Sequence, residues 1–454
     1  MDWLEDLKAT LGADCVSVEE STLATHSIDK WFASHLPDVV VYAISTEQVA
    51  ELMRFATERR IPVTPRGAGV GYVGGCVPLQ GGIALSLAKM NRILEINIAD
   101  GVAVVQPGVI TGQLQEEVRK LGWFYPPDPA SLKECSLGGN ISTNAGGPRC
   151  LKYGVTRHYV LGLHAVLADG TTLRAGGRCH KNKTGFDLVG TFVGSEGMLG
   201  IVTEATLRLI PHPPQRAMLS AGFGSFAEAA AAVQAILGGG FLPSALEISD
   251  RFTLQAAREY VGEGVPDGEA HLLVEVDGQT EAVPLEVALL ERLLTSRGAL
   301  AIETGIGEAA CERFWKMRRE FSYSLRATGL VKLNEDIVVP RGKLVELVNF
   351  AEKLQAESGF PVACFGHAGD GNIHVNVMVP TMEDPSIRGR AEAALDKLFH
   401  QIIAMGGAIT GEHGVGIAKK RWFAEAIGEG AMEAHRRLKA AYDPLGILNP
   451  GKFV

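Results

Sequence analysis

Residues 61–74 read Ile61-Pro-Val-Thr64-Pro65-Arg-Gly-Ala-Gly-Val-Gly71-Tyr-Val-Gly74, a short apolar run that enters a glycine-rich turn. The last part fits the spacing G-x-G-x-x-G, which in a Rossmann unit opens a helix whose N-terminus faces a pyrophosphate. Here the next residues are Gly75-Cys-Val-Pro-Leu-Gln-Gly-Gly82. So many glycines together with a proline do not start a helix. The stretch therefore predicts a strand followed by a loop, and argues against a nicotinamide-binding Rossmann domain.

Two further glycine-rich stretches follow, at residues 136–147 (Ser-Leu-Gly-Gly-Asn-Ile-Ser-Thr-Asn-Ala-Gly-Gly) and 194–202 (Gly-Ser-Glu-Gly-Met-Leu-Gly-Ile-Val). We expect both to be loops whose backbone N–H groups can approach an anion, because glycine takes positive φ and has no side chain in the way. One such stretch alone most often marks a tight turn or close strand packing. Three of them, well separated along the chain, indicate a large diphosphate-bearing ligand that lies across several loops, and FAD fits this description.

Composition sets the outer limits. A chain of 454 residues exceeds what one hydrophobic core usually supports, which predicts two or three domains, and 46% hydrophobic residues suffice for their cores. A net charge of −9 leaves no basic surface for nucleic acid, so we expect no such partner. The start, MDWLEDLKAT, lacks the basic end and apolar run of a signal peptide, and no run approaches the ~18 apolar residues of a membrane span. We expect a cytoplasmic protein, with peripheral attachment to a membrane through a partner left open.

The seven cysteines are scattered and contain no C-x-x-C pair. This argues against an iron–sulfur cluster or a structural zinc ribbon within the chain. We expect reduced thiols in the core.

The first half alternates short apolar runs with turns. A capping box, Ser45-Thr-Glu-Gln48, predicts the start of a helix with Val49, Leu52 and Met53 on one face. Asp169-Gly170 joins two apolar runs and predicts a hairpin. A long strand before Pro211 predicts a domain boundary. The expected strands are 39–43, 61–64, 102–106, 161–168, 171–175 and 201–210, with a second helix at 113–121.

After the boundary, strands at 218–222, 272–276, 336–339 and 373–379 alternate with helices at 226–237, 342–357 and 387–405. This pattern predicts an α+β domain with helices on one face of a largely antiparallel sheet. The expected domains are residues 1–212 (core about 37–212), 213–420, and 421–454 as a C-terminal helix and tail.

Three histidines stand out in the second half. His367 and His374 would face opposite ways on one straight strand, but the residues between them, Ala-Gly-Asp-Gly-Asn, favour a turn that brings the imidazoles together. Gly411-Glu412-His413-Gly414 adds a carboxylate and a third imidazole. Two His and one Glu suit a zinc or manganese site with room for a substrate oxygen. The alternative for either motif alone is a set of satisfied polar residues near a turn.

These motifs together resemble a known family. Pro65-Arg-Gly-Ala-Gly69, the stretch 138–147, Tyr153-Gly154 and Gly194–Val202 are similar to the FAD domain of the vanillyl-alcohol oxidase / p-cresol methylhydroxylase (PCMH) superfamily. Residues 366–374 and 411–414 narrow the resemblance to its branch of D-lactate dehydrogenases, glycolate oxidases and D-2-hydroxyglutarate dehydrogenases. The fold it implies is α+β: a two-subdomain PCMH-type FAD-binding domain followed by a cap domain of the FAD-linked oxidase C-terminal type.

The resemblance also implies how the cofactor is held. Relatives with covalent flavin carry a histidine in the first glycine loop, and Gly67–Gly75 contains none, so noncovalent FAD is implied. The tail Leu448–Lys452 is similar to a segment that returns to the FAD domain. The implied cofactor-binding residues are Pro65, Arg66, Gly67, Ala68, Gly69, Gly71, Gly138, Gly139, Ser142, Thr143, Asn144, Gly146, Gly147, Tyr153, Gly154, Glu196, Gly197, Gly200, Ile201, Val202 and Asn449.

For the substrate, the resemblance implies an FAD-dependent 2-hydroxy-acid dehydrogenase or oxidase. A D-2-hydroxy acid of the D-lactate or glycolate class would be oxidised to the 2-oxo acid, with hydride passing from C2 to flavin N5. A divalent metal would stabilise the alkoxide, and a histidine base would take the proton. The implied residues are His367, His374 and Glu412 for the metal, His413 as base, and Arg318, Asn376 and Lys332 for the substrate. Lys332 departs from the family pattern, since Asn334 stands where relatives have a lysine.

Three alternatives stay open. D-2-hydroxyglutarate would need a second cationic contact for its distal carboxylate. The chain could instead be a flavin-binding subunit of a larger oxidase complex, or a zinc hydrolase without flavin, which would leave the glycine loops unexplained. An external electron acceptor is expected, and the sequence selects none among a quinone, an electron-transfer flavoprotein, a cytochrome and an iron–sulfur protein. A homodimer is also left open.

Overall fold

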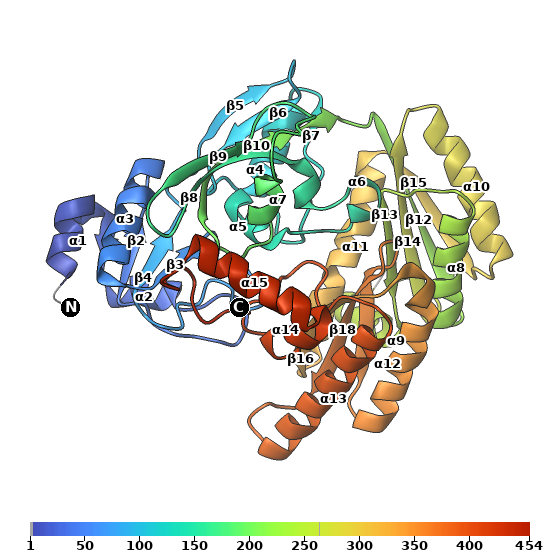
Figure 1. The fold of residues 1–454 in the computed structure, drawn as a ribbon. Helices are drawn as coiled ribbons and strands as arrows, with labels where there is room; N and C mark the ends of the chain where they lie inside the picture. The colour runs from blue at the N-terminus through green and yellow to red at the C-terminus, as the bar shows by residue number, and fades with distance from the viewer. Residues whose placement is uncertain (1–2, 263) are drawn as a thin grey trace. The chain divides into compact units, whose positions relative to one another are not determined.

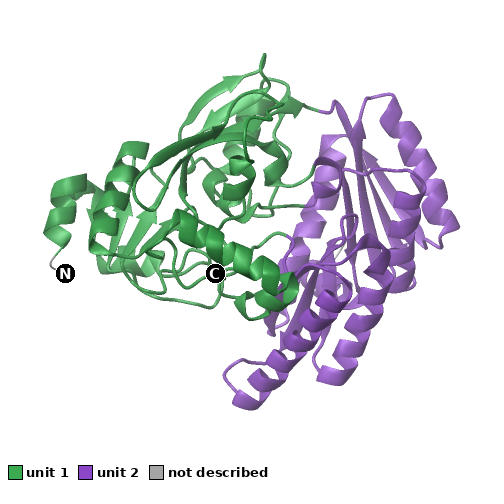
Figure 2. Ribbon diagram, viewed as in Figure 1, with its two compact units in different colours: residues 1–147, 154–212, 412–454 green, residues 148–153, 213–411 purple. Residues whose placement is uncertain are grey.

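The computed structural model describes residues 3–262 and 264–454. They form two compact units, which are coloured separately in Figure 2. Unit 1 comprises residues 1–147, 154–212 and 412–454, and unit 2 comprises residues 148–153 and 213–411. No helix among the described residues is both long enough and apolar enough to cross a bilayer.

Unit 1 contains two main sheets (Figure 1). The first has the order β1-β2-β4-β3, with β4 parallel to both β2 and β3. The second is antiparallel, with the order β5-β6-β10-β8-β9. A short pair, β7 and β11, lies apart from both. The strands are β1 Val16–Ser17, β2 Val39–Tyr42, β3 Val63–Arg66, β4 Ile83–Ser86, β5 Ile93–Asn97, β6 Val102–Val105, β7 Trp123–Phe124, β8 Val160–Val166, β9 Thr172–Gly176, β10 Ile201–Arg208 and β11 Ile210–Pro211.

The helices of unit 1 pack on these sheets and connect them. They are α1 Leu4–Leu11, α2 Glu20–His26, α3 Thr46–Arg59, α4 Thr111–Arg119, α5 Leu137–Thr143, α7 Leu188–Phe192, α14 Lys420–Ile427 and α15 Glu429–Tyr442. Helix α3 starts where the capping box predicts. Ser45 Oγ accepts the Gln48 N–H (3.3 Å), and Gln48 Oε1 accepts the Ile44 N–H (2.9 Å). Its buried Val49 and Leu52 join the core below the first sheet.

The second glycine-rich stretch is not the loop that the sequence predicts. Residues 137–143 form the short helix α5, which Ser136 caps by accepting the Gly139 N–H (3.3 Å). Asn144 ends the helix in the left-handed conformation (φ 52°). A serine N-cap and buried Leu137 and Ile141 stabilise the helix, and this outweighs the low helix propensity of its glycines.

The C-terminal tail completes the first sheet of unit 1. The Val63 N–H donates to Ile447 O (2.8 Å) and the Asn449 N–H donates to Val63 O (2.8 Å), so the tail runs parallel beside β3. Ile447 and Leu448 are buried in the same core as α3. The free edge of β3 is thereby covered.

Unit 2 is built on a seven-stranded sheet with the order β15-β12-β14-β13-β17-β18-β16. All of its pairings are antiparallel, as the sequence predicts for most of them. The strands are β12 Gln215–Phe223, β13 Ala245–Ser249, β14 Ala270–Gly278, β15 Ala301–Ile306, β16 Val331–Val338, β17 Val362–His367 and β18 Asn372–Val379. The helices are α6 Cys150–Tyr153, α8 Phe226–Gly238, α9 Arg251–Val261, α10 Ala282–Ser296, α11 Glu308–Ala327, α12 Leu344–Ser358 and α13 Pro385–Ala404.

The prediction that helices cover one face of this sheet is wrong, because they cover both. Helices α9 and α11 contact each other, and Leu325 of α11 packs against Phe365 and Met378. The opposite face consists of apolar residues such as Val274 and Val375, which are fully buried under α8, α10, α12 and α13. Helix α11 carries Arg318, which pairs with Glu247 of strand β13.

Candidate active site

The three glycine-rich stretches of unit 1 converge on helix α5. A Cβ on Gly67 would lie 2.5 Å from Ser136 Oγ, so only glycine allows the first loop to approach this closely. The third stretch pairs with the end of the helix, because the Gly194 N–H donates to Ile141 O (2.9 Å) and the Glu196 N–H to Ser142 O (2.8 Å). Segments far apart in the sequence thus form one continuous surface, at which Ala68 and Gly71 are exposed.

Arg66 supports the first loop from inside. Its guanidinium is buried and donates to Ile28 O (2.6 Å) and Thr25 O (3.1 Å). Gly69 has φ +70°, and a Cβ there would lie 2.0 Å from Arg66 Nη2. Arg66 therefore fixes the loop through its protein contacts, and Gly69 makes room for it.

Glu196 and Asn449 also have protein partners. The buried Glu196 carboxylate accepts the Val415 N–H (2.7 Å) and the Gly416 N–H (2.9 Å). Burial raises the pKa of Glu196 to about 7, against the lowering effect of these two N–H groups. Asn449 Nδ2 donates to Gly75 O (3.0 Å) and Glu196 O (2.7 Å). Both side chains bind backbone groups of the loops and the tail, and so they hold these segments together.

The other predicted cofactor residues lie along the same segments. Asn144 Oδ1 accepts the Arg157 N–H (2.9 Å), and Thr143 Oγ1 donates to Gly139 O (3.1 Å). Close packing explains several glycines, since a Cβ would lie 2.5 Å from Pro107 at Gly138 and 2.6 Å from Pro65 at Gly197. Gly147 and Gly200 are equally crowded, by Asp128 and Phe192, and Gly154 has φ +82°. Gly146 is buried, and Ile201 and Val202 begin strand β10 as buried residues.

Unit 2 has a polar face on its sheet. Cross-strand pairs place Glu247 opposite His367, Phe365 opposite His374, and Asp336 opposite His374. Residues opposite each other in an antiparallel pair point to the same face. Asn376 and Lys332 follow at the alternating positions of β18 and β16. The side chains predicted to bind substrate and metal in this unit are therefore gathered on one face.

The two histidines lie in a hairpin. His367 ends β17 and His374 follows the start of β18, so the turn at 368–371 brings their rings to a centroid distance of 5.7 Å. Glu412 directly follows Gly411, the last residue of unit 2, in the chain. His367, His374 and Glu412 offer ligand atoms that all lie within 4.8 Å of one another. Two imidazoles and a carboxylate suit Zn²⁺ or Mn²⁺ with a position open for substrate.

Glu247 links the histidine to the arginine. Its Oε2 accepts from Arg318 Nε (2.7 Å) and Nη2 (2.6 Å), and its Oε1 contacts His367 Nδ1 (2.5 Å). Burial alone would raise the pKa of Glu247, but His367 and the charge of Arg318 lower it to about 2. An ionised carboxylate can only accept, so Nδ1 of His367 carries the hydrogen of this contact, and Nε2 is the ring nitrogen left for a metal.

Two cations lie near one aromatic ring. The Arg318 guanidinium carbon is 4.8 Å from the centroid of Phe365, and Lys332 Nζ is 5.9 Å from it. Lys332 donates to Ser322 Oγ (2.8 Å). Burial, together with the charges of Arg326 and Arg318, lowers the pKa of Lys332 to about 8. The region therefore favours anions.

Asn376 and His413 complete the set. Asn376 Nδ2 donates to Ala363 O (3.0 Å) and His374 O (3.1 Å), while its buried Oδ1 has no hydrogen-bond partner among the described residues. His413 belongs to unit 1, where its ring lies 5.3 Å from that of Tyr72 with a 30° tilt.

Sequence reasoning missed Glu247 and Asp336 as supports of this site. Asp336 is fully buried and accepts from Asn372 Nδ2 (2.7 Å), Thr410 Oγ1 (3.0 Å) and the Gly411 N–H (2.9 Å). The sequence does contain a signal for Glu247, because this charged residue stands between Leu246 and Ile248 in a short, otherwise apolar strand. A charged residue at such a position is buried and needs a partner.

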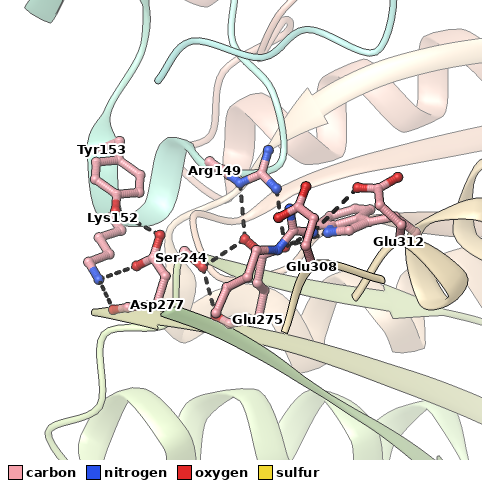
Figure 3. A network of polar contacts seen from close by, with 10 residues as sticks. Arg149, Lys152, Tyr153, Ser244, Glu275, Asp277, Glu308 and Glu312 are labelled. Atoms are coloured by element: carbon pink, nitrogen blue, oxygen red, sulfur yellow. Dashed lines mark hydrogen bonds and ion pairs between the residues drawn. The ribbon is translucent and has the colours of Figure 1, made fainter. Parts of the chain in front are cut away.

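A second polar network fixes the segment 148–153, which follows the glycine-rich stretch, to the sheet of unit 2 (Figure 3). Arg149 binds both carboxylate oxygens of Glu275 (3.0 and 3.1 Å). Lys152 pairs with Asp277, whose second oxygen accepts from the Tyr153 hydroxyl (2.7 Å). The Tyr153 hydroxyl, which the sequence predicts near the cofactor, is thus bonded to strand β14.

Two family matches together span most of the chain. Residues 37–176 match the family described as "FAD binding domain". Residues 212–453 match the family described as "FAD linked oxidases, C-terminal domain".

Curated relatives match nearly end to end. The chain is 39% identical to glycolate oxidase subunit GlcD of Bacillus subtilis, over 92% of this chain and 89% of that protein. It is 35% identical to D-lactate dehydrogenase of Anaerostipes hadrus (94% and 92%), and 36% identical to D-lactate dehydrogenase of Archaeoglobus fulgidus (92% and 91%). Among solved structures, p-cresol methylhydroxylase superposes with a TM-score of 0.80 at 21% identity, covering 100% of this chain and 96% of that one, which shows a shared fold.

Proposed function

The chain belongs to the FAD-linked oxidases, and we propose that it oxidises a D-2-hydroxy acid of the D-lactate or glycolate class to the 2-oxo acid. The single observation that carries this proposal is the polar face of unit 2, where Arg318 and the pair His367 and His374 meet through Glu247. The names of the relatives, D-lactate dehydrogenase and glycolate oxidase subunit GlcD, support the same substrate class.

The glycine-rich surface around α5 fits noncovalent FAD. Its loops approach so closely that a Cβ on Gly67 would meet Ser136 Oγ at 2.5 Å, and Gly69 and Gly71 leave backbone accessible to a diphosphate. The segment Gly67–Gly75 contains no histidine for a covalent flavin bond. FAD, when bound, supplies the acceptor for the hydride that leaves C2 of the substrate.

Arg318 is the candidate for the substrate carboxylate. Glu247 binds its Nε and Nη2, so Nη1 is the donor that a second carboxylate would meet. Arg318 is only 9% exposed, and a guanidinium at such a site binds a carboxylate more strongly than an exposed one does. Asn376 Oδ1, which lacks a hydrogen-bond partner among the described residues, would accept a hydrogen bond from the substrate hydroxyl.

Proton removal is assigned to a histidine. Hydride loss from C2 leaves the hydroxyl oxygen negative unless its proton also departs, and neutral imidazole is the side chain suited to accept it. His413 is the residue we assign to this step, since His367 and His374 are committed to the cluster with Glu412. A divalent cation in that cluster would supply a Lewis acid for the same oxygen.

D-2-hydroxyglutarate is the second candidate, favoured by one observation. Lys332 lies on the same Phe365 ring as Arg318 and is bonded to a neutral hydroxyl, Ser322. A buried ammonium of this kind would suit the distal carboxylate of a dicarboxylic acid. Electrons would then leave to an external acceptor, and the word "subunit" in the name of one relative is compatible with a protein partner.

The test is dye-linked turnover of the FAD-loaded protein with D-lactate, L-lactate, glycolate and D-2-hydroxyglutarate. We expect turnover with a D-acid or glycolate, none with L-lactate, and loss of turnover in Arg318→Met. Equal turnover by the Arg318→Met variant would remove Arg318 from substrate binding. Absence of turnover with all four acids would contradict the proposed substrate class.

A further inference from the structure

The motif Gly411-Glu412-His413-Gly414 contains the proposed metal ligand and the proposed base. That chemistry does not explain why a glycine stands on each side of them. Glu412 and His413 sit between them. Each glycine instead lies against a buried carboxylate or its partner, and the proposed mechanism does not use either carboxylate. The inference rests on the proposed function, because it concerns how Glu412 and His413 are held.

Asp336 holds the chain just before Glu412 by hydrogen bonds. Its Oδ2 accepts the Gly411 N–H (2.9 Å) and the Thr410 hydroxyl (3.0 Å), and its Oδ1 accepts from Asn372 Nδ2 (2.7 Å). A Cβ at Gly411 would lie 2.4 Å from Asn372 Nδ2. Only glycine lets the backbone come this close. Asp336 thus ties the residue before Glu412 to the strand that carries His374.

Glu196 holds the chain just after His413 by hydrogen bonds to the backbone. Its two oxygens accept the Val415 N–H (2.7 Å) and the Gly416 N–H (2.9 Å). Gly414 has φ +86°, and a Cβ there would lie 2.6 Å from Glu196 Oε1. The Glu196 backbone is itself fixed, because its N–H donates to Ser142 O and its C=O accepts from Asn449. The end of the motif is therefore tied to the glycine-rich surface.

We propose that Asp336 and Glu196 are positioning residues that hold the Glu412–His413 segment from its two ends, and so set where the metal ligand and the base stand. Three residues, Glu412, His413 and Gly414, lie between the two anchored ends. The two glycines of the motif are explained as the positions where the backbone meets each anchor. Each carboxyl group accepts two hydrogen bonds at its end of the segment, from Thr410 and Gly411 at Asp336 and from Val415 and Gly416 at Glu196.

The experiment uses the FAD-loaded full chain freed of metal by a chelator. Zn²⁺ affinity is measured by competition with a chromogenic chelator, and flavin content, kcat and KM are measured on the Zn²⁺-loaded protein, with rates given per bound flavin. The variants are Asp336→Asn and Glu196→Gln. Their matched controls are Asp250→Asn and Asp443→Asn, since each of these carboxylates also accepts two backbone N–H groups, at other places in the chain.

We expect Asp336→Asn to weaken Zn²⁺ about tenfold, the lower end of effects seen for groups that orient metal ligands. We expect Glu196→Gln to lower kcat about tenfold with KM changed less than about twofold, because the base moves and the carboxylate contact does not. The controls should match the wild-type chain in both readouts. Gly411→Ala acts on the contact with Asp336, and Gly414→Ala acts on the contact with Glu196. Each glycine variant should therefore cause little further loss when it is combined with the carboxylate variant at the same contact.

Wild-type affinity and wild-type kcat in both variants would overturn the proposal, and so would an equal loss in the controls. If either carboxylate variant fails to fold, the glycine variant at the same contact decides the result. If the unmodified chain binds no Zn²⁺ or Mn²⁺, the proposed metal site itself is wrong. That outcome is separate, because it appears in the wild-type titration before any variant is compared.

Discussion

Glu247→Gln removes the charge that joins Arg318 to His367 while keeping the shape of the side chain. Glu247 is 1% exposed, and its two partners are about 10% exposed. Removing one partner of a buried ion pair costs about 3–5 kcal/mol, because the other charge stays buried and unpaired. Glutamine keeps one acceptor oxygen, so we take the lower end, about 3 kcal/mol. In a unit of about 200 residues this lowers the melting temperature by about 6–12 °C.

The assay is a thermal melt of the metal-free protein followed by a Zn²⁺ titration. Because Glu247 fixes the Nδ1 hydrogen of His367, we expect Zn²⁺ to bind about 10–100-fold more weakly in the variant. Glu303→Gln is the control, since Glu303 pairs with Arg313 (2.6 Å) with both side chains about 60% exposed, and such pairs contribute about 0–1 kcal/mol. If Glu247→Gln melts within about 2 °C of the wild-type chain and binds Zn²⁺ equally well, the role assigned to this carboxylate is refuted.

Three further predictions follow from other contacts. Gly67→Ala should weaken FAD binding about tenfold or more, since its Cβ would overlap Ser136 Oγ. The control Gly177→Ala, which has open space around its Cβ, should bind FAD normally. Equal FAD affinities of the two variants would contradict the close packing of the first loop. Lys332 has a pKa of about 8, so it is charged below that pH and loses its charge above it. KM for D-2-hydroxyglutarate should therefore rise above about pH 8 in the wild-type chain, and Lys332→Met should abolish that rise. A flat wild-type profile would remove Lys332 from binding of the distal carboxylate. Asn449→Ala should remove the donor to the half-buried Gly75 carbonyl and to the buried Glu196 carbonyl, the buried one at about 1–3 kcal/mol, and accelerate FAD release. An unchanged FAD off-rate would show that the tail does not support the loops.

Local sequence signals predict much of the fold because they act over a few residues. Ser45 and Gln48 specify the start of α3 through bonds that both lie within one turn, and the glycines around Asp370 permit the hairpin that brings His367 and His374 together. The Asp169-Gly170 hairpin between β8 and β9 is found for the same reason. Each of these depends on neighbours in the chain, which the sequence lists directly.

Contacts between distant segments were harder to predict. The sequence of residues 137–143 is rich in glycine and favours a loop. The segment is nevertheless helical, because Ser136 caps it and because Leu137 and Ile141 are buried in the fold. Glu247 and Asp336 matter through partners 71 to 120 and 36 to 75 residues away, and no local pattern indicates those partners. The attachment of residues 148–153 to strand β14, through Arg149 and Glu275, likewise depends on a strand more than a hundred residues later.

Oxidation of a 2-hydroxy acid by this protein is measured by mixing the FAD-loaded protein anaerobically with D-lactate, glycolate, L-lactate and D-2-hydroxyglutarate. The visible absorption of oxidised flavin is followed with and without prior chelation. We expect that glycolate or a D-acid bleaches the flavin, that L-lactate does not, and that chelation stops the reaction until Zn²⁺ or Mn²⁺ is restored. A metal-loaded flavoprotein that none of the four acids reduces would contradict it.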